Sequence, residues 1–246
     1  MEAIGAGRVT VNGAPALTAA RQVAPDESVV IAGLASRFVS RGGDKFDGAL
    51  DHWSLDVTGV RALDAGASTG GFTDCLLQRG AAAVVAVDVG HGQLAWSLRS
   101  DPRVEVLERT NLRALDELPG GRAEFAVADL SFISLRTVAP ALLRLATPAA
   151  RFVLLIKPQF EAGRDRVGSG GVVRDPAVHR AVLGEVVDGL ATAGLIVGDV
   201  IRSSLRGADG NVEFLARAVQ AGPMVHASVL DDVAAPLAPA DADSTC

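Results

Sequence analysis

The sequence predicts an α/β protein with a doubly wound, mostly parallel sheet, preceded by a small α+β segment. From residue 61 onward, strand-like apolar runs alternate with helical patterns, as in a parallel sheet covered by helices. The 246 residues are enough for one such domain and a small appendage. We therefore expect a main domain over residues 40–230, after an N-terminal segment (1–33) and a linker (34–39).

Each element of the main domain is expected from its own run of residues. The expected strands are Arg61–Ala65, Ala82–Val89, Val104–Glu108, Ala123–Asp129, Phe152–Lys157, Ile196–Ser203 and Asn211–Val219. The clearest helical patterns between them span Gly71–Arg79 and His179–Ala193. The last two strands have no helix between them, only the stretch 204–210, which predicts an antiparallel end to the sheet.

The N-terminal segment shows strand signals of its own. Glu2–Gly7 looks like the last turn of a helix with a glycine stop. Residues 8–13 alternate apolar and polar side chains and end in an Asn-Gly turn, and residues 28–31 form a second apolar run. Two short strands are not stable alone. We therefore predict the second half of a small α+β module, with its first half absent.

The C-terminal residues 231–246 are rich in Ala, Pro and Asp and show no periodicity, so we expect a disordered acidic tail. They contribute four carboxylates, Asp231, Asp232, Asp241 and Asp243, to a chain with a net charge of −6. The net charge of the whole chain therefore neither favours nor opposes a nucleic-acid partner.

Composition argues against several classes of protein. The two cysteines, Cys75 and Cys246, make neither a disulfide framework nor a tetrahedral metal site. No apolar run approaches the roughly 18 residues that span a bilayer, and the first residues lack the build of a signal peptide. We therefore expect a cytoplasmic protein with no membrane partner and no bound metal.

The basic residues are 21 arginines and only two lysines, Lys45 and Lys157. An arginine stays protonated, whereas a lysine amine can lose its proton. The bias towards arginine therefore suggests that these lysines stand where arginine cannot replace them, although chance survival is the alternative.

A glycine-rich turn follows the first expected strand. Gly66 is separated by three residues from Gly70 and Gly71, so the turn lacks the G-x-G-x-x-G spacing of a dinucleotide site. Asp64 also opposes a pyrophosphate and suits a cationic ligand, such as the amino end of S-adenosylmethionine. The predicted cofactor contacts in this turn are Asp64, Ala65, Gly66, Ser68, Thr69, Gly70, Gly71 and Phe72.

Further cofactor contacts are expected at the ends of the next strands. Asp88 and Val89 end the second strand, where a carboxylate can accept hydrogen bonds from both ribose hydroxyls of an adenosine. Asn111 follows the third strand and is placed for adenine contacts, and Asp129 ends the fourth at the same mouth. A tight strand-to-helix turn would explain the glycines alone, but the combination predicts a nucleoside cofactor.

Four polar residues at element ends are candidates for chemistry: Lys45, Asp129, Lys157 and Glu213. Lys157 follows the apolar run 152–156, and desolvation or a nearby ammonium makes an amine easier to deprotonate. Such an amine can take a proton from a hydroxyl. Two structural alternatives stay open: Glu213 as a solvated edge-strand residue, and Asp129 as a cap of the following turn.

Five stretches together resemble the TlyA (hemolysin A) family of ribosomal RNA methyltransferases. They are Ser40–Gly43, Asp64–Phe72, Gly92–Trp96, Asp129–Leu135 and Lys157–Glu161. The resemblance covers about residues 1–220. It implies an FtsJ-like domain with the Rossmann-like sheet of class I methyltransferases, S-adenosyl-L-methionine as cofactor, and a catalytic tetrad of Lys45, Asp129, Lys157 and Glu213. Both lysines of the chain fall on this tetrad.

The resemblance also implies the substrate and a second module. Family members methylate the ribose 2′-hydroxyl of rRNA, usually of cytidine in 16S and 23S rRNA, and begin with an S4-type RNA-binding domain. Residues 2–33 resemble only the second half of that domain. We expect ribosomal RNA or subunits as partner of a monomer, with arginines binding phosphate: Arg37, Arg41, Arg164, Arg166 and Arg174. Each of these arginines could instead be an ordinary solvated residue.

Four other functions compete with this one. They are a small-molecule methyltransferase, an NAD enzyme, a membrane-lysing toxin and a non-catalytic RNA-binding protein. The tetrad and the S4-like segment oppose the first, and the glycine spacing opposes the second. The chain shows no strongly amphipathic basic segment of the kind a membrane-lysing protein needs.

Overall fold

The computed structural model describes residues 2–5, 7–24, 27–31 and 37–236. The chain divides into two compact units, Met1–Arg37 and Phe38–Cys246, and each is described by itself.

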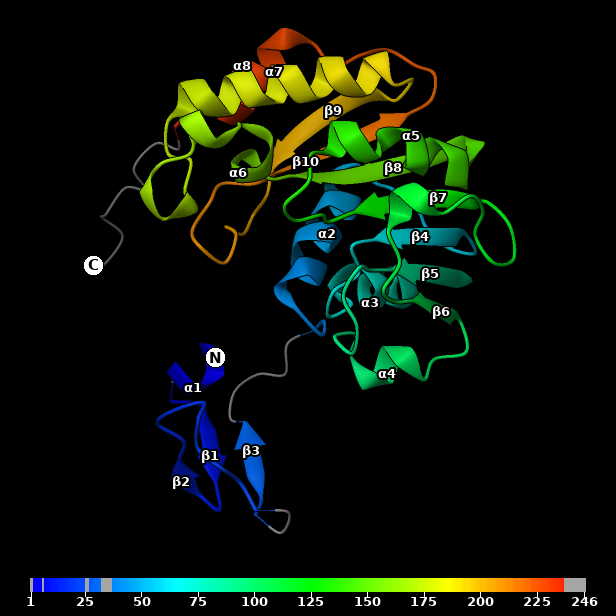
Figure 1. The fold of residues 1–246 in the computed structure, drawn as a ribbon. Helices are drawn as coiled ribbons and strands as arrows, with labels where there is room; N and C mark the ends of the chain where they lie inside the picture. The colour runs from blue at the N-terminus through cyan, green and yellow to red at the C-terminus, as the bar shows by residue number, and fades with distance from the viewer. Residues whose placement is uncertain (1, 6, 25–26, 32–36, 237–246) are drawn as a thin grey trace, which may run out of the picture. The chain divides into compact units, whose positions relative to one another are not determined.

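The first unit is a small three-stranded sheet with one short helix (Figure 1). Its elements are α1 (Glu2–Gly5), β1 (Val9–Val11), β2 (Ala14–Pro15) and β3 (Val29–Ile31). β1 lies in the middle and pairs antiparallel with both neighbours. The turn from β1 to β2 uses positive φ at Asn12 and Gly13, as the Asn-Gly signal predicts. β2 was not among the strands expected from the sequence.

The second unit contains a seven-stranded sheet in the order β6-β5-β4-β7-β8-β10-β9. The strands are β4 (Arg61–Ala65), β5 (Ala83–Val87), β6 (Val104–Leu107), β7 (Ala123–Ala128), β8 (Ala146–Ile156), β9 (Ile196–Arg202) and β10 (Phe214–Val219). β10 runs antiparallel to both β8 and β9, while the pairs from β6 to β8 are parallel. The expected α/β fold with an antiparallel last strand is confirmed.

Helices cover both faces of this sheet (Figure 1). One buried cluster joins α2 (Arg41–His52), α3 (Gly71–Gln78) and α4 (Trp96–Arg99) to the sheet, and the other joins α5 (Leu135–Leu145), α7 (Pro176–Thr192) and α8 (Ala227–Ala234). Neighbouring residues of a strand alternate between the clusters: Leu63 belongs to the second and Ala62 to the first. A short helix, α6 (Pro158–Glu161), follows β8.

β8 begins at Ala146, six residues before the expected start at Phe152. Two of the expected segment boundaries also differ from the structure. Residues 231–234, assigned from the sequence to a disordered tail, form the second half of α8, where Arg202 donates to the carbonyl oxygen of Val233. Phe38, assigned to the linker, is buried in the core cluster of the second unit. Both corrections arise from tertiary packing, which composition does not reveal. Residues 237–246 of the expected tail lie outside the described residues.

Candidate active site

Polar side chains gather where β4, β5, β7 and β8 end, because parallel strands present their carboxyl ends at one edge of a sheet. Two cavities open there, of about 420 Å³ and about 110 Å³. Gly66, Ser68 and Asp129 line both cavities, so the two form one continuous site.

The glycine-rich turn brings two strand ends into contact. Gly66 has a φ of +87°, and a Cβ there would lie 2.4 Å from the main-chain oxygen of Asp129. Gly70 has a φ of +99°, and a Cβ there would meet the side chain of Leu98. These positions require glycine because they combine positive φ with close packing. Ala65 and Gly70, both predicted as cofactor contacts, line neither cavity and instead shape the turn.

Asp64 is fully buried and borders the smaller cavity. Its Oδ2 accepts a hydrogen bond from the Thr73 hydroxyl at 2.6 Å, while Oδ1 has no hydrogen-bond partner among the described residues. Burial raises the pKa of Asp64 to about 7, with smaller contributions from Asp129 and Asp88 and an opposing one from Thr73. An unpartnered buried carboxylate oxygen fits an ammonium group in the adjoining cavity.

Asp88 lines the larger cavity, directly after β5. Its Oδ2 accepts from the Ser68 backbone N–H at 2.8 Å, and its Oδ1 accepts from the Gly90 backbone N–H at 2.7 Å. These bonds fix the carboxylate and leave each oxygen a second lone pair. The geometry suits the two neighbouring hydroxyls of a ribose.

The rest of the larger cavity consists mainly of residues that the sequence analysis did not identify. They are Gln93, Thr110, Leu112, Arg113, Leu130, Ser131, Phe132, Ile133 and Val138. Val89 and Asn111, both predicted, line it too, although the Asn111 side chain also accepts from the Arg113 backbone N–H at 3.1 Å. Apolar walls between polar ends are typical of a nucleoside pocket.

The four tetrad residues form two ion pairs. Lys45 Nζ lies 2.5 Å from Glu213 Oε2, and both side chains are at least 90% buried. Lys157 Nζ lies 2.5 Å from Asp129 Oδ1 and donates to the Ser131 hydroxyl at 3.2 Å. Lys45 and Asp129 both line the 110 Å³ cavity, so both ion pairs reach the same space.

Close packing at glycines positions the Lys45–Glu213 pair. Lys45 lies in the first turns of α2, where a Cβ at Gly43 would lie 2.3 Å from the Phe38 ring. A Cβ at Gly207 would lie 2.5 Å from Glu213 Oε1. Glu213 itself directly precedes β10, so it is a buried loop residue and not the solvated edge-strand residue of the alternative interpretation.

Glu161 is a buried acid whose structural role the sequence did not reveal. Its carboxylate accepts from the Ser134 hydroxyl at 2.5 Å and from the Leu135 backbone N–H at 2.7 Å. It thereby joins α6, which follows Lys157, to the start of α5, which follows the Asp129 loop. A carboxylate is favourable at a helix N-terminus.

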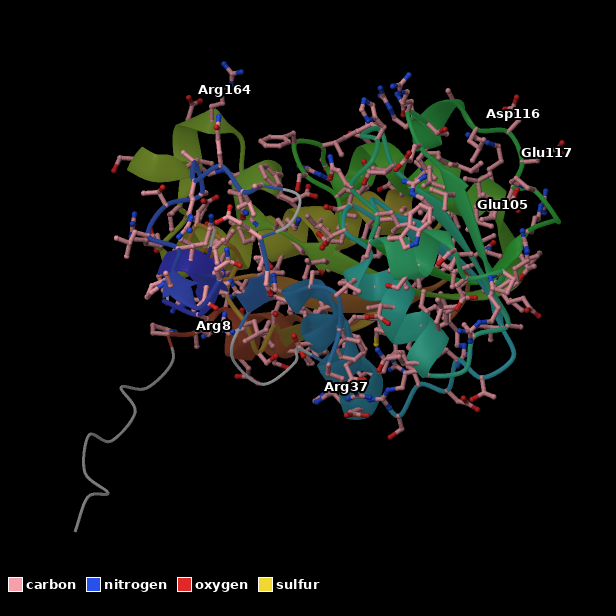
Figure 2. All side chains as sticks on the ribbon, turned by 90° about the horizontal axis from the view of Figure 1, so that it is seen from below. Arg8, Arg37, Glu105, Asp116, Glu117 and Arg164 are labelled. Atoms are coloured by element: carbon pink, nitrogen blue, oxygen red, sulfur yellow. The ribbon has the colours of Figure 1, made fainter. Side chains whose placement is uncertain are left out.

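The five predicted RNA-binding arginines fall into different settings. Arg37 lies in the first unit, whereas Arg41, Arg164 and Arg174 are exposed on the second. Figure 2 shows Arg164 projecting into solvent. Arg166 forms a bidentate pair with Glu185, at 2.7 and 2.8 Å, so its guanidinium is already engaged. Arg166 is therefore better explained as a structural residue.

Comparison with known proteins identifies the family. The FtsJ-like methyltransferase family matches residues 38–219. The chain is 52% identical over 215 residues to the 16S/23S rRNA (cytidine-2′-O)-methyltransferase TlyA of Mycobacterium tuberculosis, covering 87% of this chain and 80% of that protein. The chain belongs to the TlyA (hemolysin A) family of FtsJ-like methyltransferases. The Hemolysin A of Brachyspira hyodysenteriae is 37% identical over 217 residues, covering 86% and 88%.

Solved structures agree with this assignment. A Streptococcus thermophilus protein described as a hemolysin superposes with a TM-score of 0.82 at 38% identity, over 95% of this chain and 86% of that one. An S-adenosylmethionine-dependent methyltransferase from Mesorhizobium loti, at 17% identity and a TM-score of 0.52, shares the fold. The family and the fold are thus those of S-adenosylmethionine-dependent methyltransferases. No helix in the described part of the chain has the length and apolar character of a membrane span.

Replacing Asp88 with alanine is expected to weaken S-adenosylmethionine binding at least about tenfold, because even one hydrogen bond from a ribose hydroxyl to a charged carboxylate contributes about 1.5–3 kcal/mol. Isothermal titration calorimetry measures this loss, and circular dichroism checks the fold. Asp101→Ala, at an exposed turn away from both cavities, is the control. An unchanged affinity for Asp88→Ala would remove this residue from the cofactor site.

Cofactor affinity is expected to rise with pH through about 7, the pKa of Asp64. The ionised carboxylate binds an ammonium group, and its population increases about tenfold between pH 6 and pH 8. The dissociation constant for S-adenosylmethionine should fall by the same factor.

Two controls isolate this effect. Asp64→Asn should remove the pH dependence, and 5′-methylthioadenosine, which lacks the amino-acid group, should bind equally at both pH values. A pH dependence that persists in Asp64→Asn would assign it to another group.

Proposed function

We propose that this chain transfers a methyl group from S-adenosylmethionine to the 2′-hydroxyl of a ribose in ribosomal RNA, as a monomer in the cytoplasm. The observation that carries this proposal is the meeting of the Lys45–Glu213 and Lys157–Asp129 ion pairs at one cavity beside a nucleoside-sized pocket. The name of the M. tuberculosis relative specifies cytidine in 16S and 23S rRNA. We propose the same base here.

The bound cofactor supplies an electrophilic methyl group with its own leaving group, so the protein must bind, orient and deprotonate. When the cofactor is bound, Asp64 would hold its ammonium end and Asp88 its ribose hydroxyls. Lys157 Nζ is the group that takes the proton of the substrate 2′-hydroxyl. Asp129 positions that amine from 2.5 Å.

Lys45 and Glu213 have a different part in this proposal. Their ion pair is almost fully buried, and its Lys45 side lines the cavity. Lys45 there provides donors that can orient the substrate oxygen, while Glu213 holds Lys45 in place. We assign Lys157 as the general base and Lys45 as a positioning residue.

The test is methyl transfer to purified ribosomal subunits with radiolabelled S-adenosylmethionine, followed by mass spectrometry of the nucleosides. We expect 2′-O-methylcytidine in the rRNA of one or both subunits. Binding of rRNA without methyl transfer would support a non-catalytic RNA-binding protein. Transfer only to small acceptors would support a small-molecule methyltransferase.

A further inference from the structure

A basic pocket lies on the second unit, apart from the two cavities of the active site. Its volume is about 470 Å³, and three arginines line it: Arg174 before α7, Arg202 at the end of β9, and Arg206 in the loop 203–213. The remaining wall is largely apolar and includes Val172, Val173, Pro176, Val212, Ala234 and Pro236. The mechanism above uses none of these residues.

The positive charge of this pocket is not balanced by the described residues. Arg202 donates to the carbonyl oxygens of Val233 and Ala235, and Arg206 to that of Gly210, but within the described chain none of the three arginines forms an ion pair. Asp209 is the one acidic residue described in the lining. The pocket therefore carries more guanidinium groups than carboxylates.

Titration directions agree with a net positive potential. Burial and the neighbouring Arg206 lower the pKa of Arg202. Burial lowers the pKa of His179 in the same pocket, and the charges of Arg202 and Arg206 lower it further. The hydrogen bond with the Val173 carbonyl oxygen and the charge of Asp175 raise this pKa and so act in the opposite direction. The Asp175 side chain accepts from the Ala177 backbone N–H and so caps α7.

One loop separates this pocket from the tetrad. The loop carries Arg206 into the pocket and Glu213 into the active site. Asn211, itself 1% exposed, ties the loop to the segment before α7, accepting from the Val173 N–H at 2.9 Å and donating to the Gly171 oxygen at 3.0 Å. Arg41, at the start of α2, donates to the Arg206 oxygen at 2.8 Å. An anion held by Arg206 would thus be anchored to the elements that hold Lys45 and Glu213.

We infer that the pocket of Arg174, Arg202 and Arg206 binds a backbone phosphate of the substrate RNA, close to the methylated nucleotide. The inference rests on the proposed function and names a contact of that substrate. Guanidinium forks match phosphate oxygens, and phosphate contacts fix the register of a nucleic acid on a protein. The apolar walls can accept the sugar or base of the same nucleotide.

The test is the double variant Arg174→Gln/Arg206→Gln in the full chain. Arg202 is kept because it holds the end of α8. Filter binding of rRNA at several salt concentrations should show a slope of log K against log salt that is shallower by about 0.7–0.9, the value for one lost phosphate contact. At about 0.15 M salt this corresponds to roughly fivefold weaker binding. The KM for RNA should rise, and the affinity for S-adenosylmethionine should stay unchanged.

Two further variants serve as controls. Arg122→Gln changes an exposed arginine that directly precedes β7, whereas Asp129 directly follows the other end of that strand. This variant should leave the slope unchanged. The double substitution to lysine retains the charge and should restore most of the slope. Should the glutamine double variant lose cofactor binding through misfolding, Arg174→Gln alone carries the test, with a smaller change in slope of the same sign.

The pocket assignment would be overturned by a double variant that binds cofactor but keeps the wild-type slope and the wild-type KM for RNA. Methylation of rRNA by the wild-type chain would still support the proposed function in that case. Failure of the proposed function looks different, because the wild-type chain would then not methylate rRNA at all.

Discussion

Replacing Lys157 with arginine is expected to reduce methyl transfer about 10²–10⁴-fold, the usual contribution of a general base. A guanidinium keeps its proton at neutral pH, so it can preserve the ion pair with Asp129 but cannot accept the proton of a hydroxyl. Affinity for S-adenosylmethionine should not change. Single-turnover transfer to ribosomal subunits measures the chemical step directly.

Lys45→Arg is the matched control, since Lys45 is the other lysine of the chain. Pairing with Glu213 requires a cation and not a proton acceptor, so this variant should retain more activity than Lys157→Arg. The profile of rate against pH adds a second readout, because a base that must be neutral makes the rate rise with pH. A Lys157→Arg enzyme within a few-fold of wild type would contradict the base assignment and leave the methyltransferase assignment standing.

The substitution Glu213→Leu is expected to destabilise the fold by about 3–5 kcal/mol, the cost of leaving one partner of a buried ion pair uncompensated. Lys45 is 8% exposed and its ammonium would lose its carboxylate at 2.5 Å. Urea denaturation measures the loss as a lower midpoint. Methyl transfer should be lost as well.

The double variant Lys45→Met/Glu213→Leu separates the two effects. With both charges removed, stability should return to near the wild-type value or exceed it, because apolar pairs often match buried ion pairs. Activity should stay absent, since the cavity would have lost its donors. Asp101→Asn is the control: it breaks the exposed Arg103 pair and should cost only about 0–1 kcal/mol. An unchanged midpoint for Glu213→Leu would show that the buried pair contributes little to stability.

The sequence alone determined the fold class and predicted the candidate site residues. The apolar pattern of a strand is set by residues that are neighbours in the sequence, so it can be read without the tertiary structure. β4 was predicted at Arg61–Ala65 as observed, and the ends of most other strands were predicted to within a few residues. The positions of Asp64, Asp88, Asp129 and Lys157 at strand ends followed from the same pattern. Parallel strands then bring these side chains to one edge without further information.

The tertiary structure alone decided how these residues combine. It paired Lys45 with Glu213, 168 positions away, and left Asp64 Oδ1 without a hydrogen-bond partner among the described residues. It engaged Arg166 with Glu185, and it brought Arg174, Arg202 and Arg206 to one pocket. Such pairings depend on through-space distance and burial, which fix each ionisable group's partners and solvation. Sequence spacing constrains neither, so only the packed chain could show which charges are balanced and which remain free to bind.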